Sequence, residues 1–215
     1  MKTKNLVSIA LWIAVFLLLV VFVGKTNRAD TFKISPHDPV IGSEKAPLTI
    51  VMYGSYECSV SKAFFEEIYP KLKADFIDSG KVRFVYKNHY SSVDMSHATA
   101  AEAALCANGR GKFWDYNKIL FDNKDKWSPV LGISSMTEVF DPIFNRYAEE
   151  IGLDQAAFLE CLFGYQYKQN IIDDYINARE LGIEKTPSYI LNGFVINGMP
   201  SVKDFDMLVS KFNLG

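Results

Sequence analysis

The feature that most constrains the fold is a strand candidate that runs directly into a cysteine and then into a helix. Residues 48–53 are apolar and β-branched, as in a buried strand. After Cys58, apolar side chains recur at three- and four-residue spacing, which predicts a helix; they are Phe64, Phe65, Ile68, Tyr69 and Leu72. A second strand candidate, residues 81–88, comes next. Strand, helix and strand in this order predict a right-handed crossover between two parallel strands.

This order of elements places Cys58 at the turn where a buried strand passes into the first turn of a helix. Unpaired backbone N–H groups and the helix dipole stabilise an anion at such a turn. A thiol there is expected to have a lowered pKa and therefore to hold more of the reactive thiolate. The alternative is an inert cysteine that serves as a small apolar residue of the core.

The C-terminal part of the sequence predicts a hairpin and a last helix. Residues 186–191 form a strand candidate, Asn192 and Gly193 are a two-residue turn signal, and residues 194–196 form the returning strand. Ser201 is suited to cap a final helix with apolar residues on one face. A βαβ unit followed by a ββα unit is the thioredoxin arrangement, so the expected fold class is α/β.

Several stretches along the chain resemble DsbA-like thioredoxin-fold thiol–disulfide oxidoreductases. They are Asp38-Pro39-Val40-Ile41-Gly42, Ala46-Pro47-Leu48-Thr49-Ile50-Val51, Tyr56-Glu57-Cys58, Ala100-Ala101-Glu102-Ala103-Ala104-Leu105-Cys106, Gly111-Lys112-Phe113-Trp114, Leu120-Phe121, Thr186-Pro187 and Asn192-Gly193. The resemblance covers residues 38–213 and implies a helical domain inserted between the two thioredoxin halves, at about residues 94–181. It also implies that Thr186 and Pro187 form the family's cis-proline loop, which binds substrate.

The sequence departs from this family at the redox centre. The family has a C-x-x-C motif, whereas residues 58–61 of this chain read Cys-Ser-Val-Ser. The hydroxyl of Ser61 cannot close a disulfide with Cys58, so Cys58 is expected to form a mixed disulfide with a partner, and an outside thiol must release it. Ser61 is still expected to donate a hydrogen bond to the thiolate. The histidine of some members is missing too, so Glu57 is expected to oppose the thiolate and Lys62 to favour it.

The other two cysteines, Cys106 and Cys161, both fall in the predicted insertion. The resemblance implies that they form a structural disulfide, as in some relatives, and an oxidising compartment would favour that bond. The pairing would leave Cys58 as the free thiol. The alternative is two unpaired cysteines in the core of the insertion.

The N-terminal segment predicts a membrane anchor. An apolar run at residues 6–23 is long enough to cross a bilayer core and longer than the apolar part of a usual secretory signal. We expect residues 1–29 to be a transmembrane signal anchor with its N-terminus inside, residues 30–46 to be a linker and lead-in segment, and residues 47–215 to be an extracytoplasmic domain. A cleaved signal peptide is the alternative.

Composition and motifs argue against several other function classes. The chain has 23 Lys and Arg against 25 Asp and Glu with no basic stripe, so nucleic acid is not expected as a partner. His37, His89 and His97 have no metal-ligand spacing to the cysteines, so no metal site is expected. The sequence has no phosphate-binding glycine loop, dinucleotide fingerprint or nucleophile elbow, and no cofactor is expected.

Three functions remain open from the sequence. The leading hypothesis is an envelope thiol–disulfide oxidoreductase that acts through Cys58 in exchange, isomerisation or reduction. Its partners would be cysteine-containing exported proteins, with a membrane redox partner or a small thiol for regeneration. The second is a redox-inactive peptide-binding or chaperone-like module. The third is a thiol peroxidase in which Cys58 is oxidised to sulfenic acid.

Overall fold

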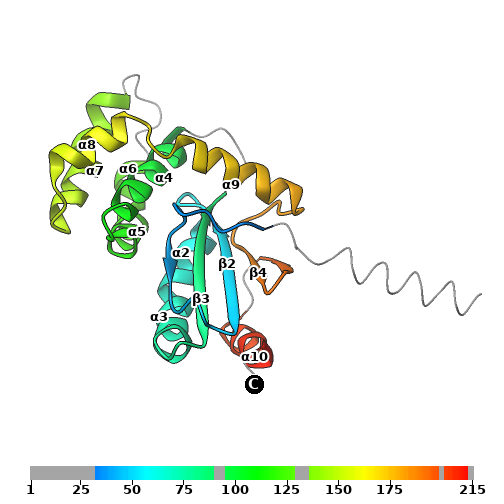
Figure 1. Cartoon of the computed structure of the whole chain (residues 1–215). Coiled ribbons are helices and arrows are strands. Elements are labelled where there is room, and N and C mark those ends of the chain that lie inside the picture. The colour runs from blue at the N-terminus through cyan, green and yellow to red at the C-terminus, as the bar shows by residue number, and fades with distance from the viewer. Residues whose placement is uncertain (1–31, 90–94, 129–135, 199–200, 213–215) are drawn as a thin grey trace, which may run out of the picture.

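The computed structural model describes residues 32–89, 95–128, 136–198 and 201–212, and its centre is a five-stranded sheet (Figure 1). The strand order is β1-β3-β2-β4-β5, with β1 (Val40–Ile41), β2 (Leu48–Gly54), β3 (Val82–Asn88), β4 (Ser188–Leu191) and β5 (Phe194–Asn197). β2 and β3 run parallel, and the other neighbouring strands are antiparallel. The predicted parallel pair and the C-terminal hairpin are therefore confirmed.

Strand β1 lies in residues 30–46, the predicted linker and lead-in segment. Val40 pairs with Val85 and Ile41 with Phe84, so the sheet begins before residue 47. The two-residue strand is too short to produce a visible period in the sequence. Gly42 ends it with a φ of 99°, and a Cβ at this position would lie 2.3 Å from the Val82 carbonyl oxygen. Only glycine allows this turn beside β3.

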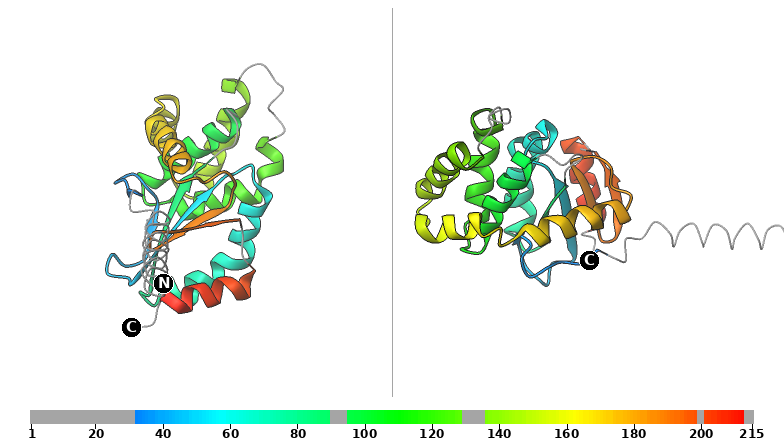
Figure 2. Two further views of the ribbon diagram at one scale, coloured as in Figure 1. Left: turned by 90° about the vertical axis from the view of Figure 1, so that its right-hand side faces the viewer. Right: turned by 90° about the horizontal axis from the view of Figure 1, so that it is seen from above.

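Both faces of the sheet are covered, which explains why its central strands are almost continuously apolar. Ile50 and Met52 of β2 face the core that includes the helix after Cys58 and Phe205 of α10 (Val202–Phe212). Val51 and Tyr53 face a second core, closed by α9 (Lys168–Glu180). The left view of Figure 2 shows the sheet between α9, in gold, and α10, in red.

One helical path leads away from Cys58, but it is not a regular α-helix. It consists of α2 (Ser59–Ala63), η1 (Phe64–Ile68), α3 (Tyr69–Leu72) and η2 (Lys73–Ile77), where η1 and η2 are π-helical. Pro70 lacks an N–H group and cannot donate to the carbonyl four residues before it, which fits a π turn directly before α3. The predicted apolar face still holds, because Phe64, Ile68 and Leu72 are buried.

The chain between β3 and β4 forms the predicted helical insertion. Its helices are α4 (Met95–Asn108), α5 (Phe113–Asp122), α6 (Lys124–Trp127), α7 (Met136–Glu150), α8 (Gln155–Phe163) and α9. Seen from above in the right view of Figure 2, α4 to α8 gather at one side of the sheet, and α9 returns along it. The buried side chains of the insertion and those under one face of the sheet form one continuous core, so the insertion is packed against the thioredoxin half.

A buried ionic cluster fixes α9 to the sheet. Lys87 Nζ on β3 lies 2.9 Å from Asp38 Oδ2 and 2.7 Å from Asp174 Oδ1 of α9, and none of the three side chains is more than 8% exposed. Burial raises the pKa of Asp174 to about 6, although Lys87 acts in the opposite direction. Removing one member of such a cluster leaves a buried charge unpaired and typically costs about 3–5 kcal/mol. The sequence gives no sign of this cluster, because its members lie far apart along the chain.

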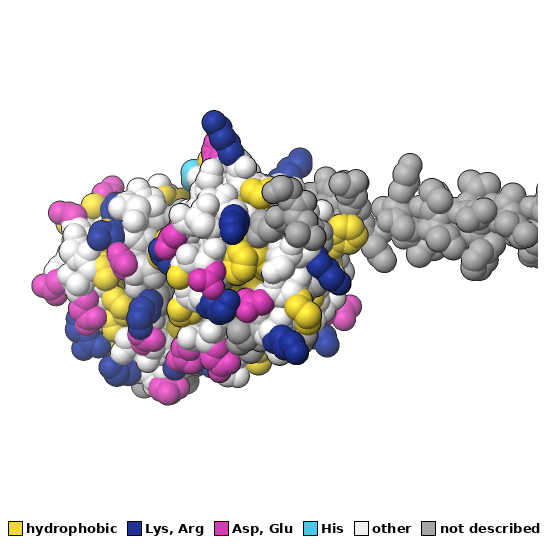
Figure 3. Space-filling model, turned by 90° about the horizontal axis from the view of Figure 1, so that it is seen from below, with side chains coloured by type: hydrophobic (Ala, Val, Ile, Leu, Met, Phe, Trp, Pro, Cys, Tyr) yellow, Lys and Arg dark blue, Asp and Glu magenta, His cyan; other side chains and the backbone are white. Residues whose placement is uncertain are grey.

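Among the residues described here, no helix is both long and apolar enough to cross a membrane. The apolar run at residues 6–23, on which the predicted anchor depends, lies outside the described residues. On the face of the molecule drawn in Figure 3, Lys and Arg side chains lie interspersed with Asp and Glu side chains. This mixture agrees with a formal net charge of −2.

Candidate active site

Cys58 lies where the central strand β2 passes into the helical path. It is the N-cap residue of α2, with extended backbone angles (φ −86°, ψ 115°), and its carbonyl accepts the Lys62 N–H at 3.1 Å. Because β2 is paired on both sides by β3 and β4, the turn starts from one of the best-supported strands of the sheet. The side chain of Cys58 is partly exposed. The position at a helix start, predicted from the sequence, is thus observed.

The loop before β4 brings a second functional residue to the cysteine. The Thr186–Pro187 peptide bond is cis, and Cys58 Sγ donates a hydrogen bond to the Thr186 carbonyl oxygen at 3.2 Å. These two residues are 128 positions apart in the sequence. The loop that the family resemblance assigned to substrate binding therefore touches the sulfur of Cys58.

Ser61 lies directly under the turn and is fully buried. Its Oγ accepts a hydrogen bond from the Ser55 backbone N–H at 3.3 Å. Both the hydroxyl and the backbone N–H of Ser61 are positioned to hydrogen-bond to the sulfur of Cys58. Ser61 is therefore placed to stabilise the charge of a Cys58 thiolate, but its hydroxyl cannot form a disulfide.

Two opposing effects set the pKa of the Cys58 thiol. Partial burial raises this pKa, because the charged thiolate loses more favourable hydration on burial than the neutral thiol does. Hydrogen bonds from the Thr186 side chain, from the backbone and hydroxyl of Ser61 and from the backbone of Val60 lower it. The hydrogen bonds prevail, so the pKa lies below its ordinary value and thiolate is enriched at neutral pH.

The comparison with known proteins agrees with this geometry. Residues 34–211 match the protein family described as thioredoxin. The chain belongs to the thioredoxin family. The match includes the strand–cysteine–helix turn, the helical insertion and the cis-proline loop of this thioredoxin-family chain.

Individual relatives identify the branch of the family. The chain is 26% identical over 178 residues to disulfide bond formation protein D of Bacillus subtilis, with 80% of this chain and 76% of the relative covered. The crystal structure of oxidised BdbD from Bacillus subtilis matches with a TM-score of 0.70 at 25% identity, covering 83% of this chain and 94% of BdbD. The fold is also that of α-DsbA1 from Wolbachia pipientis, with a TM-score of 0.72 at 23% identity over 86% of this chain and 96% of that one. The expected relation to DsbA-like thiol–disulfide oxidoreductases and the thioredoxin fold with a helical insertion are confirmed.

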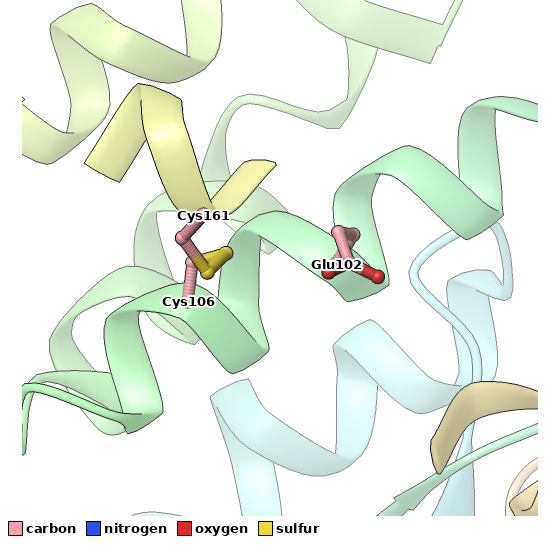
Figure 4. Close-up of side chains that lie close together, drawn as sticks. All are labelled: Glu102, Cys106 and Cys161. Atoms are coloured by element: carbon pink, nitrogen blue, oxygen red, sulfur yellow. A yellow bond between two sulfur atoms is a disulfide. The ribbon is translucent and has the colours of Figure 1, made fainter. Parts of the chain in front are cut away.

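Cys106 of α4 and Cys161 of α8 are joined by a disulfide within this insertion (Figure 4). The carboxylate of Glu102 lies on α4 near both sulfurs and accepts the Tyr167 N–H at 2.6 Å. Burial raises the pKa of Glu102 to about 7. Since both sulfurs are bonded to each other, this group offers a metal ion one carboxylate rather than three ligands. Of the three cysteines in the chain, Cys58 alone is a free thiol.

The disulfide is expected to contribute strongly to stability. Replacing both Cys106 and Cys161 with alanine should lower the free energy of unfolding by about 4 kcal/mol, because the bond closes a loop between residues 55 positions apart. Urea unfolding followed by circular dichroism measures this change. The matched control, Cys58→Ala, should alter it by less than about 1 kcal/mol. A double variant as stable as the parent would show that the bond does not constrain the unfolded chain.

Both charged neighbours of Cys58 have ion-pair partners in the structure. Lys62, predicted to favour the thiolate, forms a surface ion pair with Glu66 at 3.7 Å. Such surface pairs contribute little to the stability of the fold. Glu57 is instead faced by Lys124 of α6, with 3.6 Å between Nζ and Oε2. Nothing in the sequence connects Glu57 with Lys124, because helix packing alone brings the insertion to this turn.

Proposed function

We propose that the protein is a thiol–disulfide oxidoreductase that acts through the single nucleophilic thiol of Cys58 on cysteine-containing exported proteins. The observation that carries the proposal is the placement of a free thiol of lowered pKa at a helix start, in contact with Thr186 of the cis-proline loop. The relatives named for disulfide bond formation support the same class of reaction.

The first chemical step is attack of the Cys58 thiolate on one sulfur of a substrate disulfide. The substrate S–S bond breaks, a bond forms between Cys58 Sγ and the attacked sulfur, and the other substrate sulfur leaves as a thiolate. In the second step a thiolate from outside this protein attacks the substrate sulfur of the mixed disulfide. The bond to Cys58 Sγ breaks, a new S–S bond forms between that thiolate and the substrate sulfur, and Cys58 leaves as a thiolate. When that thiolate is another cysteine of the same substrate, the new bond is a rearranged substrate disulfide, and the result is isomerisation. When it is a small thiol, a second small thiol attacks the bond between the first small thiol and the substrate, so that the two small thiols become a disulfide and the substrate is reduced.

An outside thiol is required because residue 61 is a serine. In a C-x-x-C centre the second cysteine attacks the mixed disulfide and expels the substrate, but a hydroxyl does not perform this exchange. Ser61 therefore stabilises the thiolate before attack and after release. The second substrate cysteine, a small thiol or a membrane redox partner completes the cycle.

Substrate binding is proposed at the cis-proline loop. An extended segment that lies along Thr186 and Pro187 would form main-chain hydrogen bonds in the manner of an added strand, which aligns a substrate sulfur with Cys58. Val60, two residues after Cys58, is 41% exposed and would offer an apolar contact to such a segment. Such a surface suits unfolded or partly folded chains, in which cysteines and apolar residues are accessible.

The same loop is compatible with a second function, a redox-inactive module that binds peptides. Replacement of the second redox cysteine by Ser61 is the observation that favours it. The two functions differ in covalency, because a binding module retains its ligands in the presence of a reductant. Non-reducing gels of cells that express the protein test the difference: exchange predicts protein-containing adducts that disappear on reduction, and their absence supports the binding module.

We also propose that residues 1–29 anchor the protein in the membrane with residues 47–215 outside the cytoplasm. The support is the length and apolar character of residues 6–23. After alkaline carbonate washing the protein should remain in the membrane pellet, and peptide sequencing should recover residues 6–23. A mature N-terminus near residue 30 would instead identify a cleaved signal peptide.

A further inference from the structure

The turn that carries Cys58 is held by the helical insertion as well as by the sheet. Lys124 Nζ, on α6, donates a hydrogen bond to the carbonyl oxygen of Glu57, the residue directly before the cysteine. The same Nζ lies 3.6 Å from Glu57 Oε2, and Ser128 Oγ donates to that carboxylate oxygen at 2.8 Å. Lys124 thus contacts both the backbone and the side chain of one residue of the active-site turn.

The environment of this contact makes it stronger than an ordinary surface ion pair. The side chains of Lys124 and Glu57 are 22% and 25% exposed, so water and salt screen their interaction only partly. The ammonium group of Lys124 contacts both a carbonyl oxygen and a carboxylate oxygen, and two contacts restrict its position more than a single flexible ion pair does. Lys124 therefore has a defined position in the folded protein.

Lys124 is itself held by the core of the insertion. Trp127 of the same helix is fully buried, donates from Nε1 to the Leu120 carbonyl oxygen at 2.9 Å and packs against Phe144. On the other side of the turn, Tyr56 donates to Asn117 Oδ1 of α5 at 3.0 Å. The two residues that precede Cys58 are therefore both fixed by helices of the insertion.

The charges also matter for the thiolate. Glu57 directly precedes Cys58 in the chain, and a negative charge close to a thiol raises the pKa of that thiol. The pKa of Cys58 is nevertheless lowered, and the groups that lower it are hydrogen-bond donors and not positive side chains. Lys124 supplies the positive charge that balances Glu57, so that those hydrogen bonds determine the protonation of Cys58.

We propose that Lys124 is a positioning residue for the Cys58 thiolate, which fixes the turn through the Glu57 carbonyl and neutralises the Glu57 carboxylate. This inference rests on the proposed function in one respect, because the proposed exchange is the reaction in which the thiolate would be used. It assigns the insertion a direct part in the reactivity of a cysteine that belongs to the thioredoxin half.

The test is the pH profile of Cys58 alkylation by iodoacetamide in the full chain, with the Cys106–Cys161 disulfide intact. Lys124→Met keeps the length of the side chain but removes its charge and its hydrogen bonds. The midpoint should rise by on the order of half to one pH unit, and the rate at neutral pH should fall about 3- to 10-fold. Lys118→Met on α5, whose lysine is 74% exposed and pairs only with Asp122 among the contacts described, is the matched control and should not move the midpoint.

A second variant separates positioning from a general loss of structure. Adding Glu57→Gln to Lys124→Met removes the unbalanced carboxylate and should return the midpoint most of the way to the parent value. Lys124→Arg should also keep the parent midpoint. An unchanged midpoint in folded Lys124→Met, or no recovery in the double variant, overturns the proposal. Failure of the proposed function would give a different result. The parent protein would then form no mixed disulfides, although Lys124→Met would still raise the midpoint of Cys58 alkylation.

Discussion

Replacing Cys58 with alanine should abolish the covalent capture of disulfide-containing substrates completely. When the parent protein, with Cys58 as a free thiol and the Cys106–Cys161 disulfide intact, is mixed with a peptide that has one internal disulfide, intact-mass spectrometry should detect a mixed disulfide between the two. The variant should show none, because its remaining two cysteines are joined to each other and are at most 3% exposed. The effect is complete and not graded, since the side chain that forms the new bond is absent.

Ser59→Ala is the matched control for this loss. The side chain of Ser59 is exposed at the first position of α2, and it is not among the groups that lower the pKa of Cys58. Capture should therefore proceed at close to the parent rate. Adducts that persist in Cys58→Ala would contradict the single-thiol mechanism and would direct attention to the disulfide of the insertion.

The second large effect is expected from Ser61→Cys, which should shorten the lifetime of the mixed disulfide by on the order of 10²-fold or more. Ser61 lies within hydrogen-bonding reach of the sulfur of Cys58, so a thiol introduced there would attack the adduct from within the same molecule. Intramolecular reactions of well-placed groups correspond to effective concentrations far above those of any free thiol. Stopped-flow mixing followed by acid quenching and mass analysis measures the decay.

Ser61→Ala provides the comparison for this variant. It removes the hydroxyl without supplying a resolving thiol, so the adduct should remain long-lived while the pKa of Cys58 rises through the loss of one hydrogen bond. Equal adduct lifetimes in the parent and in Ser61→Cys would mean that the geometry of this turn does not permit internal resolution. The slow release would then need another cause than the missing cysteine.

Much of the fold could be predicted because local sequence patterns indicate its main strands, helices and turns. The apolar run before Cys58 and the three- and four-residue spacing after it identify β2 and the helical path, and Asn192-Gly193 identifies the hairpin. Strand β1 could not be predicted, since two residues form no period. The π-helical turns were missed because helical spacing of apolar residues does not distinguish π from α geometry over one turn.

In the candidate site, too, some residues could be predicted from the sequence and others could not. Cys58 is found from the local strand–cysteine–helix pattern, whereas Thr186 and Pro187 are found from the family resemblance. The structure brings Cys58 and Thr186 into contact. Lys124 was not found, because its relation to Glu57 depends on how the insertion packs on the turn. The buried cluster of Lys87, Asp38 and Asp174 was missed for the same reason. Interactions between distant charged residues have no local signature in one sequence.

The most direct test of the account is the thiolate titration of Cys58 in the full-length protein, followed by ultraviolet absorbance with Cys58→Ala as the blank. Cys58 is the single free thiol, so the difference between the two titrations reports that residue alone. The account predicts a midpoint clearly below the ordinary thiol value of about 8.5, because hydrogen bonds to the thiolate outweigh the effect of burial. A midpoint at or above that value would contradict it and would leave Cys58 as an inert residue at the start of a helix.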